Sequence, residues 1–182
     1  MFTTQTLKNI FSIAALSITL YGCNTYNPIE NMRCEYQTSP KGVDTPYPRF
    51  TWEYRTQENS YENFRQVGYQ LYISERKEDL KELAKITPAI DFTKTEASYT
   101  VYSGNPILKP ETRYYWRVSV SADGRKFFID SPIASFETGK GNAANWTAAW
   151  ITDAFDKNEA PAPMLRKRFT AKNNIKQARL YI

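Results

Sequence analysis

The chain has 182 residues and a net charge of +5, with no histidine and two cysteines. Without histidine, catalytic triads and zinc sites that depend on imidazole are excluded. Residues 23–144 hold 16 basic and 16 acidic residues, whereas residues 145–182 hold seven basic and three acidic ones. A neutral main region followed by a short basic stretch does not predict a nucleic-acid partner.

The first 23 residues have the pattern of an export signal. The apolar run from Ile10 to Leu20 has 11 residues, too few to cross about 30 Å of hydrocarbon at about 1.5 Å per residue. The run leads into Leu20-Tyr21-Gly22-Cys23, which resembles a bacterial lipobox. We therefore expect a signal peptide over 1–23, a lipid on Cys23, and a membrane-anchored lipoprotein on the periplasmic or cell-surface side. An ordinary signal peptide without lipidation would also export the protein.

Alternating apolar residues predict strands along the middle of the chain. Residues 24–33 are polar and predict a tether. Two strands are then expected, each with one apolar face, formed by Phe50, Trp52 and Tyr54 in 48–54 and by Val67, Tyr69, Leu71 and Ile73 in 66–73. Glu75–Lys85 follows helical spacing and predicts a short helical insertion. Short strands are expected at 89–92 and 98–102.

The segment 108–120 combines a turn with a long half-buried strand. From residue 112 onward the even positions are Thr, Tyr, Trp, Val and Val, and the odd positions are mostly polar. The pattern Leu108-x-Pro110-x-Thr112-x-Tyr114 resembles the tyrosine corner of fibronectin type III domains. Strands at 126–129 and 133–138 bring the total to about seven. The sequence therefore predicts an all-β protein with a fibronectin type III-like antiparallel sandwich over 34–138.

A second, shorter region follows this sandwich. Residues 139–145 are rich in glycine and asparagine and predict a linker. Residues 146–182 open a new apolar pattern, with alternation at 164–169 and 175–182 that predicts two strands. Because so few residues seldom bury a core unaided, we expect the incomplete start of a second β-sandwich. The chain would then be part of something longer or the product of an interrupted gene.

Several motifs occur in a characteristic order. They are Pro40-x-Gly42-Val43-Asp44, Pro48-Arg49-Phe50-Thr51-Trp52, Gln66-Val67-Gly68-Tyr69-Gln70-Leu71, Tyr114-Tyr115-Trp116-Arg117-Val118, Ser135-Phe136-Glu137-Thr138-Gly139, Trp146-x-x-x-Trp150-Ile151 and Pro163-Met164-Leu165-Arg166-Lys167-x-Phe169. In this order they resemble the amino-terminal region of bacterial α-L-rhamnosidases of glycoside hydrolase family 78. The final motifs resemble the start of that family's second sandwich, the rhamnosidase N-terminal domain. The chain departs from the family pattern at Ala89-Ile90-Asp91-Phe92.

The resemblance implies an accessory role in a glycoside hydrolase. The family's catalytic carboxylates lie in a downstream (α/α)6 barrel that these residues do not include, so no catalytic, cofactor-binding or metal-binding residue is assigned. The resemblance further implies that a rhamnose-containing glycan is bound by that missing domain. We therefore expect the chain alone to be inactive. The alternatives are a stand-alone envelope-anchored module that binds glycans or assists assembly, and a nonfunctional remnant.

Two tyrosines are candidates for glycan contact. Tyr72 and Tyr115 fall on the polar faces of their strands, where an exposed ring can stack on a sugar while Arg113 or Arg117 bonds its hydroxyls. In the competing interpretation the two arginines simply pack over Tyr115. Two tryptophans, Trp52 and Trp116, are predicted core residues. Two aspartates, Asp123 and Asp130, fit turns better than calcium ligands.

Overall fold

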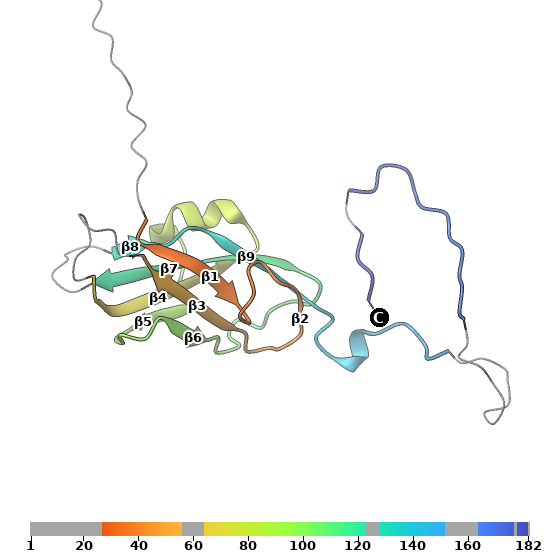
Figure 1. The fold of residues 1–182 in the computed structure, drawn as a ribbon, viewed down its shortest axis with the longest axis horizontal. Helices are drawn as coiled ribbons and strands as arrows, with labels where there is room; N and C mark the ends of the chain where they lie inside the picture. The colour runs from red at the N-terminus through yellow and green to blue at the C-terminus, as the bar shows by residue number, and fades with distance from the viewer. Residues whose placement is uncertain (1–26, 56–63, 123–127, 152–163, 177, 182) are drawn as a thin grey trace, which may run out of the picture. The chain divides into compact units, whose positions relative to one another are not determined.

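The computed structural model describes residues 27–55, 64–122, 128–151, 164–176 and 178–181, and their regular structure is almost entirely β (Figure 1). The strands are β1 (Ile29–Cys34), β2 (Lys41–Val43), β3 (Arg49–Tyr54), β4 (Gln66–Ser74), β5 (Ile90–Thr93), β6 (Tyr99–Val101), β7 (Arg113–Ala122), β8 (Phe128–Asp130) and β9 (Ala134–Thr138). Three short 3-10 turns accompany them: η1 (Lys77–Lys81), η2 (Leu83–Lys85) and η3 (Ala143–Asn145). The predicted all-β class is confirmed.

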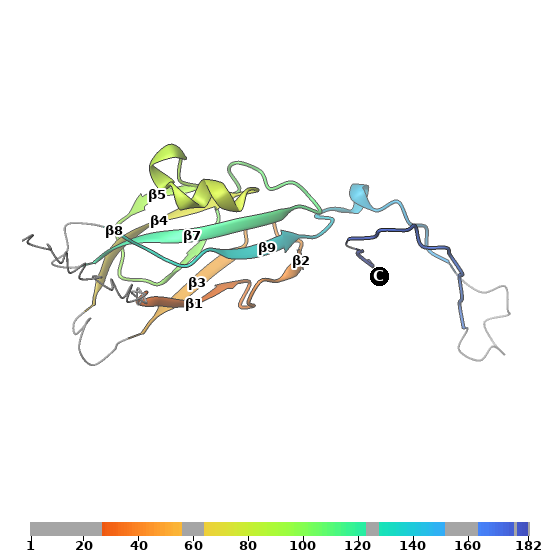
Figure 2. The same ribbon diagram turned by 90° about the horizontal axis from the view of Figure 1, so that it is seen from above.

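The strands form two sheets that pack face to face. The small sheet has the order β1-β3-β6, and the large sheet has the order β2-β9-β7-β4-β5, with β8 paired to β7. Neighbouring strands run antiparallel except β2 and β9, which are parallel. Figure 2 shows the sheets as two layers, with η1 and η2 on the side of the large sheet that faces away from β3. The result is a β-sandwich with one partly covered outer face.

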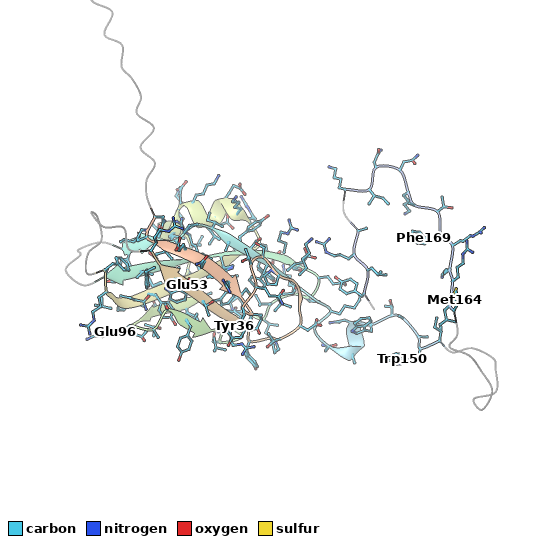
Figure 3. The ribbon with its side chains drawn as sticks, in the orientation of Figure 1. Tyr36, Glu53, Glu96, Trp150, Met164 and Phe169 are labelled. Carbon is cyan, nitrogen blue, oxygen red and sulfur yellow. The ribbon has the colours of Figure 1, made fainter. Side chains whose placement is uncertain are left out.

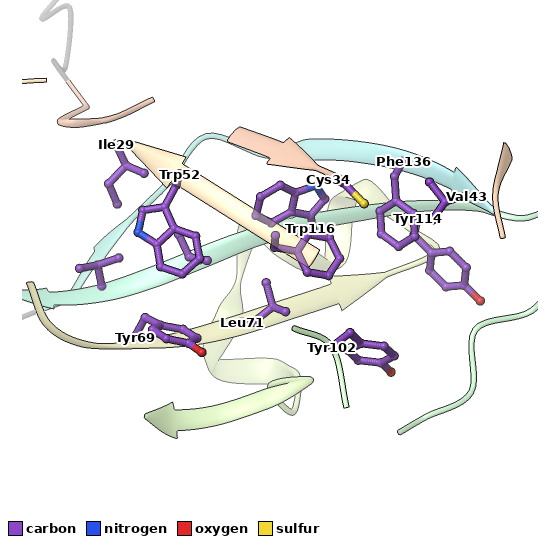
Figure 4. Packing of buried hydrophobic residues seen from close by; sticks show 13 residues of the cluster. Ile29, Cys34, Val43, Trp52, Tyr69, Leu71, Tyr102, Tyr114, Trp116 and Phe136 are labelled. Carbon is purple, nitrogen blue, oxygen red and sulfur yellow. The ribbon is translucent and has the colours of Figure 1, made fainter. Parts of the chain in front are cut away.

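Aromatic side chains from both sheets fill the core (Figure 4). Phe50 of the small sheet contacts Trp116 and Phe136 of the large sheet, with ring centroids 4.6 and 5.5 Å apart. Trp52 meets Tyr69 edge to face at 5.1 Å, a favoured geometry for aromatic pairs. The predicted core positions Trp52 and Trp116 are both fully buried.

One buried polar side chain crosses the space between the sheets. The Gln66 amide nitrogen donates to the carbonyls of Thr95 and Ala97, at 2.9 and 2.6 Å. Its amide oxygen accepts from Trp52 Nε1 at 3.1 Å and from the Tyr54 hydroxyl. Since buried polar groups are costly unless hydrogen-bonded, this arrangement satisfies the amide on both sides.

The first strand lies where the sequence predicted a tether. Residues 24–33 were expected to be a tether, but Ile29–Cys34 forms β1 and pairs with β3. The buried positions Ile29 and Cys34 are five residues apart, which simple alternation forbids. A register shift between Glu30 and Arg33, with a positive φ of 50° at Asn31, restores both ends to the core.

The predicted helical insertion consists of two 3-10 turns instead of one helix. η1 and η2 replace it, and Leu80 of η1 is fully buried, whereas Ala84 of η2 is exposed. Ser74 precedes η1, accepts from the Arg76 amide at 3.0 Å and donates to Asp79 at 2.7 Å. The buried Leu80 and the bond from Arg117 to its carbonyl seat the insertion on β4 and β7.

The chain divides into two compact units after Gly141, within the predicted linker 139–145. In the second unit the described residues include η3 and no strand, so the strands expected at 164–169 and 175–182 are not formed there. Large apolar side chains are exposed, including Trp150, Met164 and Phe169 (Figure 3). A second sandwich in this region stays a prediction. No helix within the described ranges is long and apolar enough to span a membrane.

Candidate functional site

The outer face of the large sheet carries the candidate residues named from the sequence. We use "outer face" for the side of the large sheet that is turned away from the core. Strand pairing brings Tyr72 opposite Arg117 and Ser74 opposite Tyr115. The core partners alternate with them, since Leu71 lies opposite Val118. The register therefore brings together the residues that the sequence analysis had placed on two separate strands.

The ring of Tyr72 is buried, contrary to the sequence expectation. Only 7% of the residue is exposed. η1 packs against β4 and β7 on this face, a contact that strand alternation does not predict. The Tyr72 hydroxyl donates to Gln70 Oε1 at 3.2 Å, and burial raises the pKa of the phenol. The ring of Tyr72 is therefore not available as an open stacking platform.

Arg117 is held by the protein itself. Its guanidinium donates to the backbone carbonyl of Ser131 from Nε at 3.0 Å and from Nη2 at 2.5 Å, and to the carbonyl of Leu80 at 2.8 Å. The Asp130 carboxylate lies 3.8 Å away. Burial lowers the pKa of Arg117, opposed by the charge of Asp130. The side chain joins η1, β7 and the loop before β9, so its donors are engaged within the fold.

Tyr115 is half-buried between Ser74 of β4 and Ser135 of β9. Its neighbour Arg113 pairs with Glu137 of β9, with Nη2 3.5 Å from Oε2. Arg117 is thus not arranged as the sugar-hydroxyl donor considered from the sequence, whereas the Arg113 side chain remains 47% exposed beside Glu137. Glycan contact by Tyr115 stays a prediction that rests on the partly exposed ring.

The turn before β7 has the hydrogen bond that is characteristic of a tyrosine corner. The Tyr114 hydroxyl accepts from the backbone amide of Lys109 at 2.9 Å, five residues upstream. Thr138 Oγ1 accepts from the Thr112 amide at 2.9 Å and donates to the Lys109 carbonyl at 2.7 Å. These bonds connect the corner to the end of β9.

Two hydrogen bonds on the outer face were not expected from the sequence. Gln70 Nε2 donates to Asp91 Oδ1 at 3.3 Å, and Ser119 Oγ donates to Asp130 Oδ1 at 2.5 Å. Alternation along β4 does place Gln70 between Gly68 and Tyr72 on the outer face. The partner Asp91 is not predictable in the same way, because a register shift interrupts the pairing of β4 with β5.

The described residues contain no group of three or more histidine, cysteine or acidic residues that could hold a metal ion. Cys34 is buried, and burial followed by the charge of Glu35 raises the pKa of its thiol to about 12. A thiol with such a pKa is protonated at neutral pH and unreactive. The predicted lipidation site Cys23 and the turn residue Asp123 lie outside the described residues.

Two sheets packed face to face, with a tyrosine corner before β7, define an immunoglobulin-like β-sandwich domain. Residues 29–142 match the family described as "Rha78A-like, N-terminal immunoglobulin domain", and the chain belongs to this family. The resemblance to the amino-terminal region of α-L-rhamnosidases is therefore confirmed.

The relatives are much longer than this chain. An α-L-rhamnosidase of Streptomyces avermitilis is 31% identical over 129 residues, which cover 70% of this chain and 12% of that protein. The three curated α-L-rhamnosidases that match are covered over 12%, 16% and 19% of their lengths.

Solved structures show the same likeness. The α-L-rhamnosidase of Dictyoglumus thermophilum matches with a TM-score of 0.60 and 29% identity, over 69% of this chain and 14% of that one. The Streptomyces avermitilis α-L-rhamnosidase, solved with L-rhamnose, gives a TM-score of 0.50 and 26% identity, over 68% of this chain and 12% of its own. The similarity is thus confined to a small part of each larger enzyme.

Proposed function

We propose that this chain is the non-catalytic, amino-terminal accessory portion of an exported α-L-rhamnosidase-like glycoside hydrolase. The observation that supports this most is the match to an N-terminal domain family over residues 29–142, together with coverage of at most 19% of the curated relatives. Hydrolysis of a rhamnose-containing glycan would then be performed by a catalytic barrel outside these residues. The sandwich would support that barrel.

An assay of the isolated chain on an aryl α-L-rhamnoside tests the non-catalytic part of this proposal. We expect no turnover above a no-protein control. Turnover that survives repeated purification would show that the chemistry lies within these residues. A second measurement is the mass of the native product, detected with antibodies raised against the sandwich. A species far larger than 21.1 kDa supports the accessory role, and a species of that mass argues against it.

Export and anchoring through Cys23 form a separate part of the proposal. The apolar run Ile10–Leu20 and the lipobox-like Leu20-Tyr21-Gly22-Cys23 support it. Metabolic labelling with a fatty-acid analogue in a bacterial host is expected to label the chain and to fail with Cys23→Ala. Equal labelling of both proteins would remove lipidation at this residue from the proposal.

The second candidate is a stand-alone glycan-binding module, favoured by the half-exposed ring of Tyr115. Binding to a glycan array that is lost on Tyr115→Ala would support this candidate, and a silent array would leave it without support. We also propose that the sandwich is fibronectin type III-like. This proposal is supported by the bond between Tyr114 and Lys109, a feature of several sandwich families.

A further inference from the structure

A row of polar side chains crosses four strands of the outer face. In this row Gln70 of β4 lies opposite Ser119 of β7, and Ser119 lies opposite Asp130 of β8. Asp91 of β5 extends the row through its bond to Gln70, and Asp130 extends it through its bond from Ser119. Asp91 is exposed, Gln70 and Asp130 are partly exposed, and Ser119 is buried, so two carboxylates and an amide reach the surface while the Ser119 hydroxyl holds Asp130 in place.

Two aromatic rings border this row on one side. Phe128 of β8 lies opposite Ser121 in the adjacent row. The Phe92 ring packs directly on Gly68, where a Cβ atom would lie 2.4 Å from Phe92 Cζ. The two rings meet edge to face at 5.9 Å, and each phenylalanine is 46% exposed. They therefore form an aromatic wall that remains open to solvent.

Tyr72 borders the row on its other side. Its hydroxyl donates to Gln70 Oε1 at 3.2 Å. The pKa of Tyr72 is raised first by burial and then by the charges of Asp130 and Asp91, which is consistent with both carboxylates lying near the phenol. The acceptor oxygens between the two borders are held by donors of the domain itself. Gln70 Oε1 accepts from Tyr72, Asp91 Oδ1 accepts from Gln70 and the Phe92 amide, and Asp130 Oδ1 accepts from Ser119.

We propose that Gln70, Asp91 and Asp130, bordered by Phe92 and Phe128, form a binding site for a neutral sugar, with Ser119 positioning Asp130. Carboxylates accept hydrogen bonds and donate none, so they fit the hydroxyl donors of a sugar. The phenylalanine rings provide an apolar surface for the C–H face of a pyranose. This site is separate from Tyr115 and does not depend on the proposed accessory role.

The charges of the site select the ligand class. Two carboxylates repel anionic ligands such as phosphates and acidic glycans. A cationic ligand is disfavoured at Asp130, because the Arg117 guanidinium lies 3.8 Å from that carboxylate. A neutral, hydroxyl-rich molecule with one apolar face satisfies both the acceptors and the rings.

Titration of the full chain, labelled for NMR, tests the site. The neutral probes are methyl α-L-rhamnopyranoside, xylotetraose, cellotetraose and mannotetraose, and a lysine tetrapeptide serves as the cationic probe. We expect at least one neutral probe to shift the backbone amides of Gln70, Ser119 and Phe128, without a strong dependence on salt. If none of the neutral probes shifts these amides, or if the shifts centre on Tyr115, the site is refuted. Binding of the lysine peptide alone overturns the assignment to neutral sugars.

Single-residue variants test whether binding depends on this site or on another part of the surface. Phe128→Ala and Asp91→Asn are each expected to weaken binding by about tenfold or more, which corresponds to about 1.4 kcal/mol. Tyr36→Ala removes a more exposed aromatic side chain, 60% exposed, that follows β1 of the small sheet, and is expected to leave the affinity unchanged. Unaltered binding by a correctly folded Asp91→Asn variant would overturn the proposal, even if Phe128→Ala failed to fold. Failure of this titration leaves the rhamnoside assay and the native mass unaffected.

Discussion

The Gln66 side chain joins the two sheets by hydrogen bonds. Gln66→Leu would leave the Thr95 and Ala97 carbonyls without the amide donor and would place an apolar group beside the Tyr54 hydroxyl. An unsatisfied buried polar group costs about 1–3 kcal/mol, so we expect a loss of about 2 kcal/mol or more in the free energy of unfolding. Urea unfolding measures it, with exposed Gln37→Leu as the control. Equal unfolding midpoints would contradict this account.

The first hairpin turn provides a prediction on pH. Glu35 and Tyr36 both have positive φ, 48° and 62°, and the Glu35 carboxylate accepts from the Arg49 backbone amide and guanidinium. The hydrogen bond from the Arg49 side chain is the main cause of a lowered pKa at Glu35. Because the folded pKa lies below the unfolded value near 4.5, the stabilisation is complete above that pH and is lost as the pH falls through the folded pKa.

We therefore expect Glu35→Gln to be less stable than the parent chain at pH 7. The difference in free energy of unfolding should shrink as the pH falls below about 4.5. Unfolding curves across this range measure both. A difference that stays constant from pH 7 to pH 3 would show that the ionised carboxylate contributes nothing to the turn. Exposed Glu53→Gln, on β3 of the same sheet, is the matched control.

Trp52, Trp116 and Tyr72 show what alternation can and cannot predict. Trp52 and Trp116 were placed in the core because period-two spacing decides which face of a strand is apolar. The same reasoning placed Tyr72 on an open surface, and this was wrong. The outer face is covered locally by η1, and the seating of a short insertion depends on the burial of Leu80 and the bonds of Arg117. Contacts of this kind are not encoded in the spacing of any one strand.

The tyrosine corner connects the turn at Lys109 to β7, and we expect it to stabilise the sandwich. Tyr114→Phe removes the acceptor for the Lys109 amide while keeping the ring stacked on Phe136, with centroids 5.5 Å apart. A lost hydrogen bond of this kind costs about 0.5–1.5 kcal/mol, so we expect a destabilisation of about 1 kcal/mol. Thermal unfolding measures it. Tyr115→Phe changes the adjacent, half-buried residue and should have a smaller effect. The reverse order would argue against the corner as a stabilising element.

The strands differ in how far the sequence predicts them. β3, β4 and β7 keep apolar alternation along most of their length, and their patterns predicted both their positions and their core faces. β1 contains a register shift, and β2 has only three residues, so neither presents a run that alternation can detect. The polar row of the proposed sugar site shows a further limit. Its members come from four strands, and their order in the sheet is set by tertiary pairing.

The sandwich continues past β9 into residues 139–141, which are hydrogen-bonded to Val43 and Asp44. The Gly139 amide donates to the Val43 carbonyl at 2.9 Å, and the Gly141 amide donates to Asp44 Oδ1 at 2.9 Å. A Cβ atom at Gly139 would lie 2.2 Å from the same carboxylate oxygen, so glycine is needed for this close approach. The first residues of the predicted linker thus belong to the sandwich.

Hydrogen exchange on the full chain tests this division. The sandwich has a continuous buried core and paired strands, whereas the described residues after Gly141 include no strand and expose Met164, Phe169 and Leu180. Amides that lack such pairing exchange through low-energy openings. We therefore expect strong protection in β4 and β7 and at Gly139 and Gly141, with fast exchange in 164–176. Asp44→Ala should release protection at Gly141 while β4 stays protected. Strong protection in 164–176 would contradict the division, because it would require strand partners that the described residues of this chain do not provide.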